Sequence, residues 1–274
     1  MTAPQRDKAL RFQQMHAGPG ALLVPNPWDA GSARMLAGLG FQALATSSGA
    51  CAGTFGRRDG QVSRDEAIAH ARAIALATEL PVAADLENGF GHAPEDAAQT
   101  IVLAAQAGVV GGSIEDASGD NDKPIYDLGH AIERVEAAVR AARALDFPFT
   151  LTARTENHVR GKTDLDDTIR RLQAYEKAGA DVLFAPGLPD LESVRVVCAA
   201  LSKPVNFMVG IRGRSFTVAE LEAAGVRRIS FATSLYRAAM SGLIDAAREI
   251  KEHGSFGYLD HTVTTPELNG YLRG

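Results

Sequence analysis

Residues 82–116 decide the fold, and their sequence is VAADLENGFGHAPEDAAQTIVLAAQAGVVGGSIED. They begin with a short apolar run, continue through an alanine-rich segment with apolar residues three and four positions apart, and end in a second short apolar run after Gly108. Such short runs are typical of buried strands, and the spacing between them is typical of an amphipathic helix. A strand, a helix and a strand in this order predict two parallel strands joined by a right-handed crossover.

The same alternation continues from residue 21 to about residue 250. Ser63 followed by Glu66 has the spacing of a capping box, which marks the start of one of the intervening helices. Eight such units in 274 residues predict an α/β fold of the (β/α)₈ type, a TIM barrel. An open doubly wound sheet is the alternative, but its glycine-rich fingerprint is absent after the first run. The eight apolar runs are 21–26, 43–49, 82–89, 111–116, 149–156, 182–187, 204–210 and 227–233.

No linker or low-complexity stretch interrupts the alternation, so we expect one domain over residues 1–274, with its barrel core at about 21–250. Residues 251–274 contain aromatic side chains but little periodicity. Such a tail is expected to contact another subunit.

The composition excludes several classes of function. A net charge of −5 without any cluster of Lys and Arg argues against nucleic acid as a partner. No apolar run approaches the roughly 20 residues of a membrane span, and the first residues lack the apolar middle of a signal peptide, so we expect a cytoplasmic protein without a membrane partner. The two cysteines, Cys51 and Cys198, form neither a disulfide framework nor a metal-binding spacing.

Polar side chains gather where the predicted strands end. In a TIM barrel, the carboxyl ends of the strands meet around one pocket, which holds the catalytic residues. Asp85 and Glu87 are two positions apart, which places both on one face of an extended strand. The strand-end residues are Ser47, Ser48, Gly49, Asp59, Asp85, Glu87, Glu115, Asp116, Arg154, Glu156 and Asn157.

So many carboxylates in one pocket repel one another unless a cation offsets them. Oxygen ligands without His or Cys favour Mg²⁺ or Mn²⁺ over Zn²⁺, and one direct carboxylate suffices because Mg²⁺ keeps several waters. The alternative is that some of these acids form ion pairs with Arg154.

An α-oxo or α-hydroxy carboxylate would chelate such a metal and keep one negative charge. Arg154 can bind that charge as a bidentate fork. The Ser47 hydroxyl and the backbone N–H groups of Ser48 and Gly49 can form an anion cradle. An internal salt bridge of Arg154 and an ordinary turn at Ser47 remain alternatives. Together these groups predict a small anionic substrate.

The chain resembles the isocitrate lyase and phosphoenolpyruvate mutase superfamily over nearly its whole length. The motifs that carry the resemblance are PNPWDAGSA at 25–33, DLENGFG at 85–91, GGSIED at 111–116, TARTE at 152–156 and AGAD at 178–181. The resemblance implies a barrel whose eighth helix is exchanged with a neighbouring subunit, a homotetramer or homodimer, and Mg²⁺-dependent making or breaking of C–C or P–C bonds in small oxo acids. It also implies a metal shell of Asp59, Asp85, Glu87 and Glu115, and substrate-binding groups at Trp28, Ser47, Ser48, Gly49 and Arg154.

Three departures from the family pattern affect the expected chemistry. Glu87 replaces the more usual Asp. The loop at 115–127 reads EDASGDNDKPIYD and lacks the cysteine with which the lyases protonate the departing acid. Pro186 stands where the lyases have Glu and the mutases have His. A proton donor must therefore come from elsewhere, and the candidates are Asn121, Asp122, Lys123 and Tyr126 in this lid loop, with His158 behind them.

The leading hypothesis is a Mg²⁺-dependent lyase or decarboxylase that acts on a small 2-oxo or 2-hydroxy carboxylic acid. A phosphoenolpyruvate mutase or phosphonopyruvate hydrolase is the nearest alternative, based on Asn121. Arg212 and Arg214 after the seventh strand suggest a phosphate-binding barrel as a different enzyme class. A non-catalytic barrel that binds oxo acids is a third.

Overall fold

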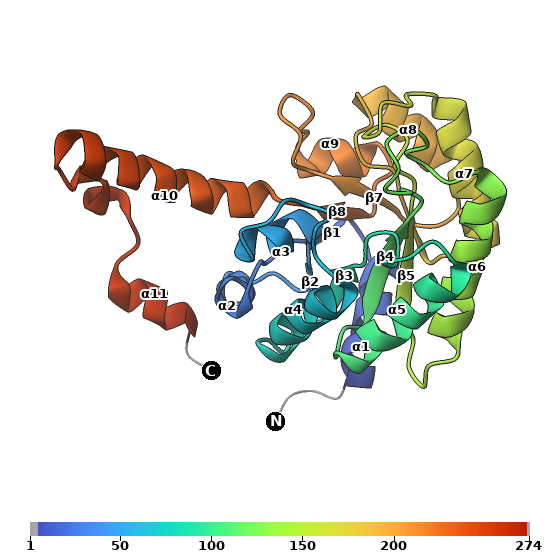
Figure 1. Cartoon of the computed structure of the whole chain (residues 1–274), viewed down its shortest axis with the longest axis horizontal. Helices are drawn as coiled ribbons and strands as arrows, with labels where there is room; N and C mark the ends of the chain where they lie inside the picture. The colour runs from blue at the N-terminus through green and yellow to red at the C-terminus, as the bar shows by residue number, and fades with distance from the viewer. Residues whose placement is uncertain (1–4, 273–274) are drawn as a thin grey trace.

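The structure is a computed structural model that describes residues 5–272. Eight parallel strands form one sheet in the order β1-β8-β7-β6-β5-β4-β3-β2, so consecutive strands from β2 to β8 pair with one another and β1 pairs with β8 (Figure 1). This order confirms the predicted TIM barrel. The strands are β1 Leu22–Val24, β2 Leu44–Ala45, β3 Val82–Asp85, β4 Gly111–Glu115, β5 Thr150–Arg154, β6 Val182–Phe184, β7 Val205–Met208 and β8 Arg228–Ser230.

The barrel closes between β1 and β2 through two hydrogen bonds. The backbone N–H of Ala45 donates to the carbonyl of Pro25 at 3.1 Å, and the side-chain amide of Asn26 donates to the carbonyl of Thr46 at 2.8 Å. Both bonds lie at the carboxyl ends of the strands. The junction between β1 and β2, which share no ladder of paired residues, is therefore connected at the end of the barrel that holds the candidate site.

Helices follow the strands as the alternation predicts. The capping box of Ser63 and Glu66 is present at the start of α4. The helices are α1 Gln5–Ala17, α2 Ala30–Gly38, α3 Ser48–Thr54, α4 Arg64–Leu76, α5 Pro94–Gln106, α6 Leu128–Arg143, α7 Leu165–Lys177, α8 Leu191–Ala199, α9 Val218–Ala223, α10 Ser234–His253 and α11 Thr265–Leu272, with a 3₁₀ turn η1 at Gly257–His261.

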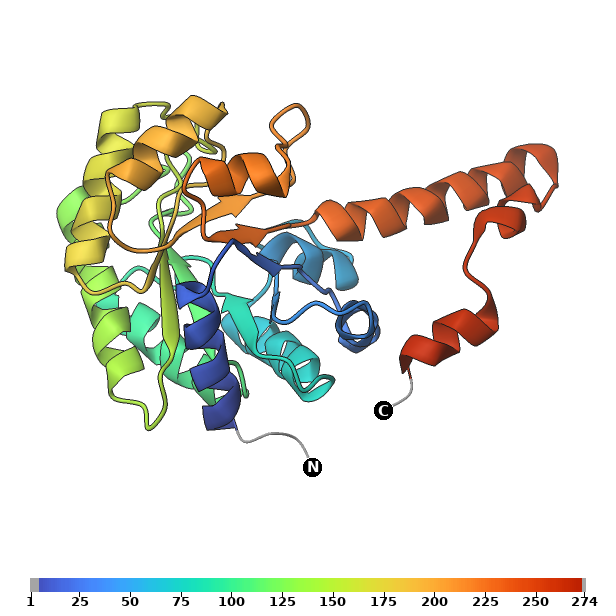
Figure 2. The ribbon, with the colours of Figure 1, turned by 180° about the vertical axis from the view of Figure 1, so that it is seen from behind.

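Helix α1 precedes the barrel and was not predicted. Its sequence is mostly polar, and the apolar side chains that it buries completely are Ala9 and Phe12. Phe12 packs with Val24, Ala43 and Val110, which lie at or beside the strands. Helix α1 thus covers the end of the barrel opposite the candidate site (Figure 2). Two completely buried apolar side chains in 13 residues, in a mostly polar sequence, are too few for the periodicity to reveal a helix.

Helix α10 leaves the barrel and extends away from it, and the chain then turns back towards α2 through η1 and α11 (Figures 1 and 2). None of the α10 residues is buried within this chain. In α11, the carbonyl of Leu272 accepts a hydrogen bond from Arg34 of α2 at 2.9 Å. The predicted tail at 251–274 is therefore helical in part. Residues 1–4 and 273–274, which belong to the single predicted domain, lie outside the described residues.

Two expectations about the chain as a whole concern cysteines and membranes. Cys51 and Cys198 are both free thiols. Within residues 5–272, no helix combines the length and the apolar character that crossing a bilayer would require.

Candidate active site

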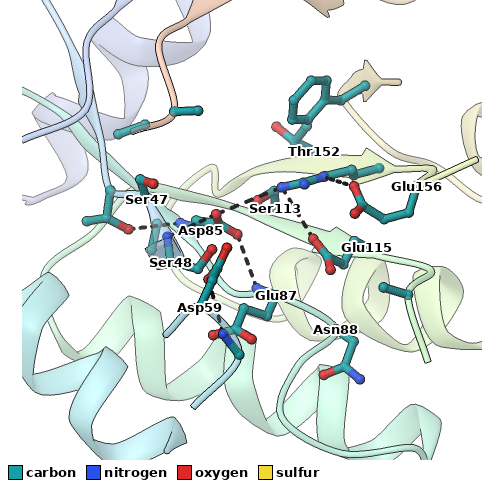
Figure 3. Close-up of a pocket in the computed structure, with 18 of the residues that line it drawn as sticks. Ser47, Ser48, Asp59, Asp85, Glu87, Asn88, Ser113, Glu115, Thr152 and Glu156 are labelled. Atoms are coloured by element: carbon teal, nitrogen blue, oxygen red, sulfur yellow. Dashed lines mark hydrogen bonds and ion pairs between the residues drawn. The ribbon is translucent and has the colours of Figure 1, made fainter. Parts of the chain in front are cut away.

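A cavity of about 1040 Å³ opens at the carboxyl ends of the strands. Residues from all eight predicted strands or the loops after them line it, and Figure 3 shows how acids from separate strands face one space. The predicted site residues that line it are Ser47, Ser48, Asp59, Asp85, Glu87, Glu115 and Arg154. The structure thus brings the predicted acids and Arg154 together.

The carboxylate of Asp85 is held by two backbone N–H groups. That of Ser48 donates to one oxygen and that of Glu87 to the other, each at 3.2 Å. Ser47 caps helix α3, because its hydroxyl accepts a hydrogen bond from the N–H of Ala50. In the predicted anion cradle, the N–H of Ser48 already donates a hydrogen bond to the Asp85 carboxylate. An acid of the chain therefore binds where a substrate anion was expected.

Glu87 faces the cavity, but not for the reason that the sequence suggested. Strand β3 ends at Asp85, and Leu86 turns into the apolar core, where it is 1% exposed. Glu87 then has a φ of 48°, a left-handed conformation that non-glycine residues seldom adopt. Its carbonyl accepts the N–H of Glu115 at 3.0 Å, which ties this turn to β4. Burial, followed by the charges of Asp85 and Asp59, raises the pKa of Glu87 to about 8.

Asp59 reaches the cavity from the loop between α3 and α4. A Cβ atom on Gly49 would lie 2.9 Å from a methyl carbon of Thr233 and 3.2 Å from a carboxylate oxygen of Asp59. Only glycine at this position lets both approach. Burial and the charge of Asp85 raise the pKa of Asp59.

Arg154 is surrounded by acids. Its Nε lies 2.5 Å from an oxygen of Glu156, and its Nη1 lies 3.3 Å from Glu115 and 3.9 Å from Asp85. Burial alone would lower the pKa of Arg154, but these carboxylates raise it. The half-exposed Arg160 lies 3.4 Å from Glu156 as well. Arg154 therefore forms internal ion pairs with Glu156 and Glu115, as the alternative prediction for this residue stated.

Among the described residues, Asp59 and Glu87 form no ion pair within 4.0 Å, although the more distant charge of Arg154 acts on both. Six acids and four arginines line the cavity, which leaves a formal charge of −2 when all of them are ionised. Across residues 5–272, no three His, Cys, Asp or Glu side chains are close enough to chelate one ion together. The arrangement matches a site with one direct carboxylate ligand and several water ligands, a common form of Mg²⁺ binding.

Asp116, at the end of β4, turns away from the cavity. It accepts hydrogen bonds from Tyr175 at 2.6 Å, from Thr155 at 2.9 Å, from the N–H of Glu156 at 2.8 Å and from Arg171 at 3.2 Å. Asp116 is a buried structural acid that fixes the start of the loop after β5.

The candidate proton donors lie around the cavity and do not line it. Asn121, Asp122 and Lys123 are exposed. Tyr126 is half-buried; its hydroxyl accepts a hydrogen bond from Asn88 at 3.3 Å and lies 2.8 Å from Nδ1 of His92. Because Asn88 lines the cavity, Tyr126 is the candidate with a hydrogen-bonded connection to it.

The remaining predicted residues also lie away from the cavity. His158 is buried, its Nε2 has no partner within residues 5–272, and burial together with Arg214 lowers its pKa. Trp28 packs edge to face on Tyr236, with 5.7 Å between ring centroids. Arg212 and Arg214 are exposed, and Arg214 donates to the carbonyl of Gly187.

Sequence reasoning missed the polar layer beneath the strand ends. Ser113, Thr152, Asn206 and Arg228 each lie two positions before another lining residue on the same strand, and this alternation was the signal that could have revealed them. Other missed polar lining residues include Asn26, Asn88 and Ser230.

Comparison with known proteins shows the family of the chain and agrees with its fold. The model of the phosphoenolpyruvate phosphomutase family matches residues 12–251. A 2-methylisocitrate lyase of Shewanella oneidensis is 30% identical, and the alignment covers 96% of this chain and 92% of that protein. A Burkholderia cenocepacia protein, provisionally described as a lyase or mutase, has a crystal structure with a TM-score of 0.96 and 49% identity, covering 98% of this chain and 97% of that one. The structure of an oxaloacetate acetylhydrolase in complex with its product oxalate has a TM-score of 0.88 and 26% identity, covering 98% and 94%.

Proposed function

Because the chain belongs to the phosphoenolpyruvate phosphomutase family, we propose that it is a carbon–carbon lyase of small 2-oxo or 2-hydroxy carboxylic acids. The observation that carries this proposal is the convergence of Asp59, Asp85 and Glu87 on one cavity in which Arg154 is the nearest cation and already pairs with Glu115 and Glu156 (Figure 3). The similarity to a 2-methylisocitrate lyase and to an oxaloacetate acetylhydrolase supports carbon–carbon cleavage.

The residues present fit a divalent cation, Mg²⁺ or Mn²⁺. All donors are oxygens, and the lining acids outnumber the arginines by two. Burial, followed by the charges of Asp85 and Asp59, raises the pKa of Glu87 although Arg154 opposes this shift. Asp85 would bind the ion directly, since two N–H groups fix its orientation, and Asp59, Glu87 and Glu115 would hold the waters around it. When bound, the ion would stabilise negative charge that develops on the substrate oxygen as the bond breaks.

The chain supplies the remaining parts of the reaction. Arg154, anchored on Glu156, presents a fixed positive charge beside Asp85. Tyr126 is the lid residue that we favour as proton donor, since burial raises its pKa and keeps the hydroxyl protonated. Asn121, Lys123 and His158 remain candidates that would need the loops after β4 and β5 to rearrange.

Phosphorus–carbon cleavage is the second candidate, and the description of the matching family favours it. It rests on Asn121, whose side chain is exposed in this structure. The similarity to the 2-methylisocitrate lyase and the oxaloacetate acetylhydrolase makes carbon–carbon cleavage the first choice.

We also propose that the active protein is a homodimer or homotetramer in which α10 packs on a neighbouring barrel. Helix α10 is 20 residues long, and none of them is buried within its own chain. It exposes Leu243 and Ile244, and Phe256 and Leu259 beyond it are exposed as well. A second copy of the chain would cover these apolar side chains.

One experiment tests the reaction type. The protein is incubated with Mg²⁺ and either a panel of 2-oxo and 2-hydroxy acids or phosphonopyruvate, and products are followed by proton and phosphorus NMR. Turnover of a carboxylic acid that stops when EDTA is added supports the proposal. Turnover of phosphonopyruvate alone would replace it with the second candidate. Mg²⁺-dependent binding of oxalate without any turnover would leave a barrel that only binds oxo acids.

A further inference from the structure

Side chains from three segments of the chain surround Tyr126 beside the cavity. The Tyr126 ring packs edge to face on His92 and His130, with 5.9 Å and 5.1 Å between ring centroids. The guanidinium carbon of Arg134 lies 4.7 Å from the centroid of the same ring. Of these residues, only Tyr126 has a role in the reaction proposed above.

The hydrogen bonds of Asn88 fix which atom of its amide faces Tyr126. Oδ1 of Asn88 accepts the backbone N–H of Phe90 at 3.0 Å, so Nδ2 is the atom that lies 3.3 Å from the Tyr126 hydroxyl. An amide nitrogen only donates, and the hydroxyl oxygen therefore accepts this bond. The single hydrogen of the hydroxyl remains available for a second partner.

The second partner of the Tyr126 hydroxyl is His92, whose Nδ1 lies 2.8 Å from the oxygen. A neutral imidazole has one nitrogen that donates and one that accepts. The arrangement that satisfies both groups has Tyr126 donating to Nδ1, while the hydrogen of the imidazole is on Nε2. In this state the tyrosine proton points towards a side chain that does not line the cavity.

The backbone of His92 is fixed in place by helix α6. Nε2 of His130 lies 2.8 Å from the His92 carbonyl oxygen, and Nη1 of Arg134 donates to the same oxygen. Arg134 is 1% exposed and donates to the carbonyl of Asn88 as well. The loop that carries Asn88 and His92 is therefore tied to α6, which keeps both partners of the Tyr126 hydroxyl in position.

Protonation of His92 reverses its hydrogen bond with Tyr126. A protonated imidazole carries a hydrogen on both nitrogens, so Nδ1 then donates to the hydroxyl oxygen. The oxygen now accepts from both His92 and Asn88, and its own hydrogen has to turn to another acceptor. Because Asn88 lines the cavity, a water molecule there can connect the hydroxyl to a bound acid.

His92 can exchange protons with water because its side chain is exposed. It lines a second pocket of about 470 Å³ between the loops after β3 and β4. Among the described residues, the group that hydrogen-bonds to the His92 ring is the Tyr126 hydroxyl. The titratable and charged groups near His92 are Tyr126, His130 with Glu133 behind it, Arg134, Asp96, which accepts the N–H of Ala93, and Asp120 across the second pocket.

We propose that His92 is a positioning residue that directs the proton of Tyr126: the neutral imidazole holds this proton outward, and the protonated imidazole releases it towards the cavity. In each turnover Tyr126 gives its proton to the product carbon, Nδ1 of His92 returns a proton to the tyrosinate oxygen, and water protonates His92 again. This inference rests on the proposed function, because that function requires a proton donor.

Two histidine variants beside the same tyrosine ring test the proposal. His92→Phe removes Nδ1 and keeps an aromatic ring, whereas His130→Phe changes the other ring without touching the hydroxyl. The kcat of each protein is measured with Mg²⁺ from about pH 5 to about pH 9, on an acid that the unaltered protein turns over.

The expected result is a ratio of kcat values that depends on pH for one variant only. The ratio of the unaltered protein to His92→Phe should fall by about tenfold towards high pH, because the hydroxyl must first break its bond to neutral His92. The ratio for His130→Phe should stay within about twofold across this range. KM should change by less than about threefold in both variants, since neither side chain contacts the substrate.

Neutron diffraction tests the same arrangement without turnover. In deuterium-exchanged crystals at about pH 9, the deuterium of Tyr126 should point to Nδ1 of His92. At about pH 5, Nδ1 should carry its own deuterium, and that of Tyr126 should point elsewhere. A deuterium on Nδ1 at high pH, or a tyrosine deuterium that does not move, would overturn the proposal. Thermal unfolding shows whether the variants fold, and if His92→Phe does not, the neutron result decides.

The outcomes separate the two proposals. If an acid is turned over with Mg²⁺ but the ratio for His92→Phe is independent of pH, or if His130→Phe behaves in the same way as His92→Phe, His92 has no positioning role and the proposed function stands. If no acid is turned over, the proposed function fails and the role of His92 fails with it.

Discussion

Nε of Arg154 lies 2.5 Å from Oε1 of Glu156, two residues further along the chain. The arginine that the sequence assigns to the substrate is therefore also the partner of an acid that is 2% exposed. Glu156 in turn is held by Asp116 through its backbone N–H at 2.8 Å. Arg154 thus has a fixed position in the site before any ligand arrives.

Replacing Arg154 should destabilise the protein far more than replacing Arg160. Arg154→Met leaves Glu115 and Glu156 buried without their main partner, which costs about 3–5 kcal/mol. Arg160→Met removes a half-exposed partner of the same two acids and should cost less than about 1 kcal/mol. Urea unfolding at pH 7 measures both. Equal losses would show that Arg154 does not neutralise the buried acids.

Asp85→Ala should abolish Mg²⁺-dependent binding of oxalate. The variant removes the carboxylate that the N–H groups of Ser48 and Glu87 orient. Calorimetry with and without Mg²⁺ should show a loss of about a hundredfold or more, comparable to loss of a direct ligand. Asp122→Ala, which removes an exposed acid of the lid loop, is the matched control. Unchanged affinity in Asp85→Ala would rule out this metal site.

His16 should make the protein less stable in acid. Its pKa is lowered to about 4 in the folded protein, first by burial and then by Arg228, while the unfolded chain titrates near 6.5. Below pH 6.5 the unfolded state binds a proton that the folded state does not, so stability falls as the pH falls towards 4. His16 should contribute a loss of up to about 2 kcal/mol between pH 7 and pH 5.

Comparison with His16→Leu isolates this contribution. Urea unfolding of both proteins at pH 7 and pH 5 gives the difference, and the variant should lose less stability than the unaltered protein. Parallel pH dependence of the two proteins would contradict the lowered pKa.

Tyr175→Phe should reduce stability by about 1–2 kcal/mol. The Tyr175 hydroxyl is fully buried and donates to Asp116 at 2.6 Å, so its loss leaves a buried carboxylate with one donor fewer. Tyr271→Phe removes a more exposed hydroxyl and should have little effect. Thermal and urea unfolding measure both variants. A neutral Tyr175→Phe would mean that Arg171 and Thr155 alone satisfy Asp116.

Charged residues on α10 should dissociate the proposed oligomer. Leu243→Glu and Ile244→Glu place carboxylates on the exposed apolar surface of this helix. Light scattering coupled to size exclusion should show a dimer or tetramer for the unaltered protein and a smaller species for both variants. Glu252→Lys, on the same helix, controls for charge. A monomeric unaltered protein would refute the assembly.

The fold was predictable because strand and helix signals agree with each other along the chain. Short apolar runs, the capping pair at Ser63 and Glu66, and the eightfold repetition indicate one architecture, and the strand order confirms it. Helix α1 escaped prediction because it buries few apolar side chains, as described above. Its contacts depend on the barrel having closed first.

The sequence predicted which acids face the cavity better than it predicted how their neighbours position them. Asp59, Asp85, Glu87 and Glu115 do face one cavity. Their neighbours could not be foreseen, because the left-handed turn at Glu87 depends on a hydrogen bond from β4. The buried polar layer depends on which side chains meet across the barrel, and that requires register between strands far apart in the sequence.

The position of helix α1 also bears on how an ion and a substrate reach the cavity. Phe12 packs against Val24, Ala43 and Val110 at the far end of the barrel, while the carboxylates line the cavity at the strand ends. These carboxylates would repel an anionic substrate that arrives alone, and the proposed divalent ion would offset their charge. We therefore expect ordered addition, with the ion first and the acid second.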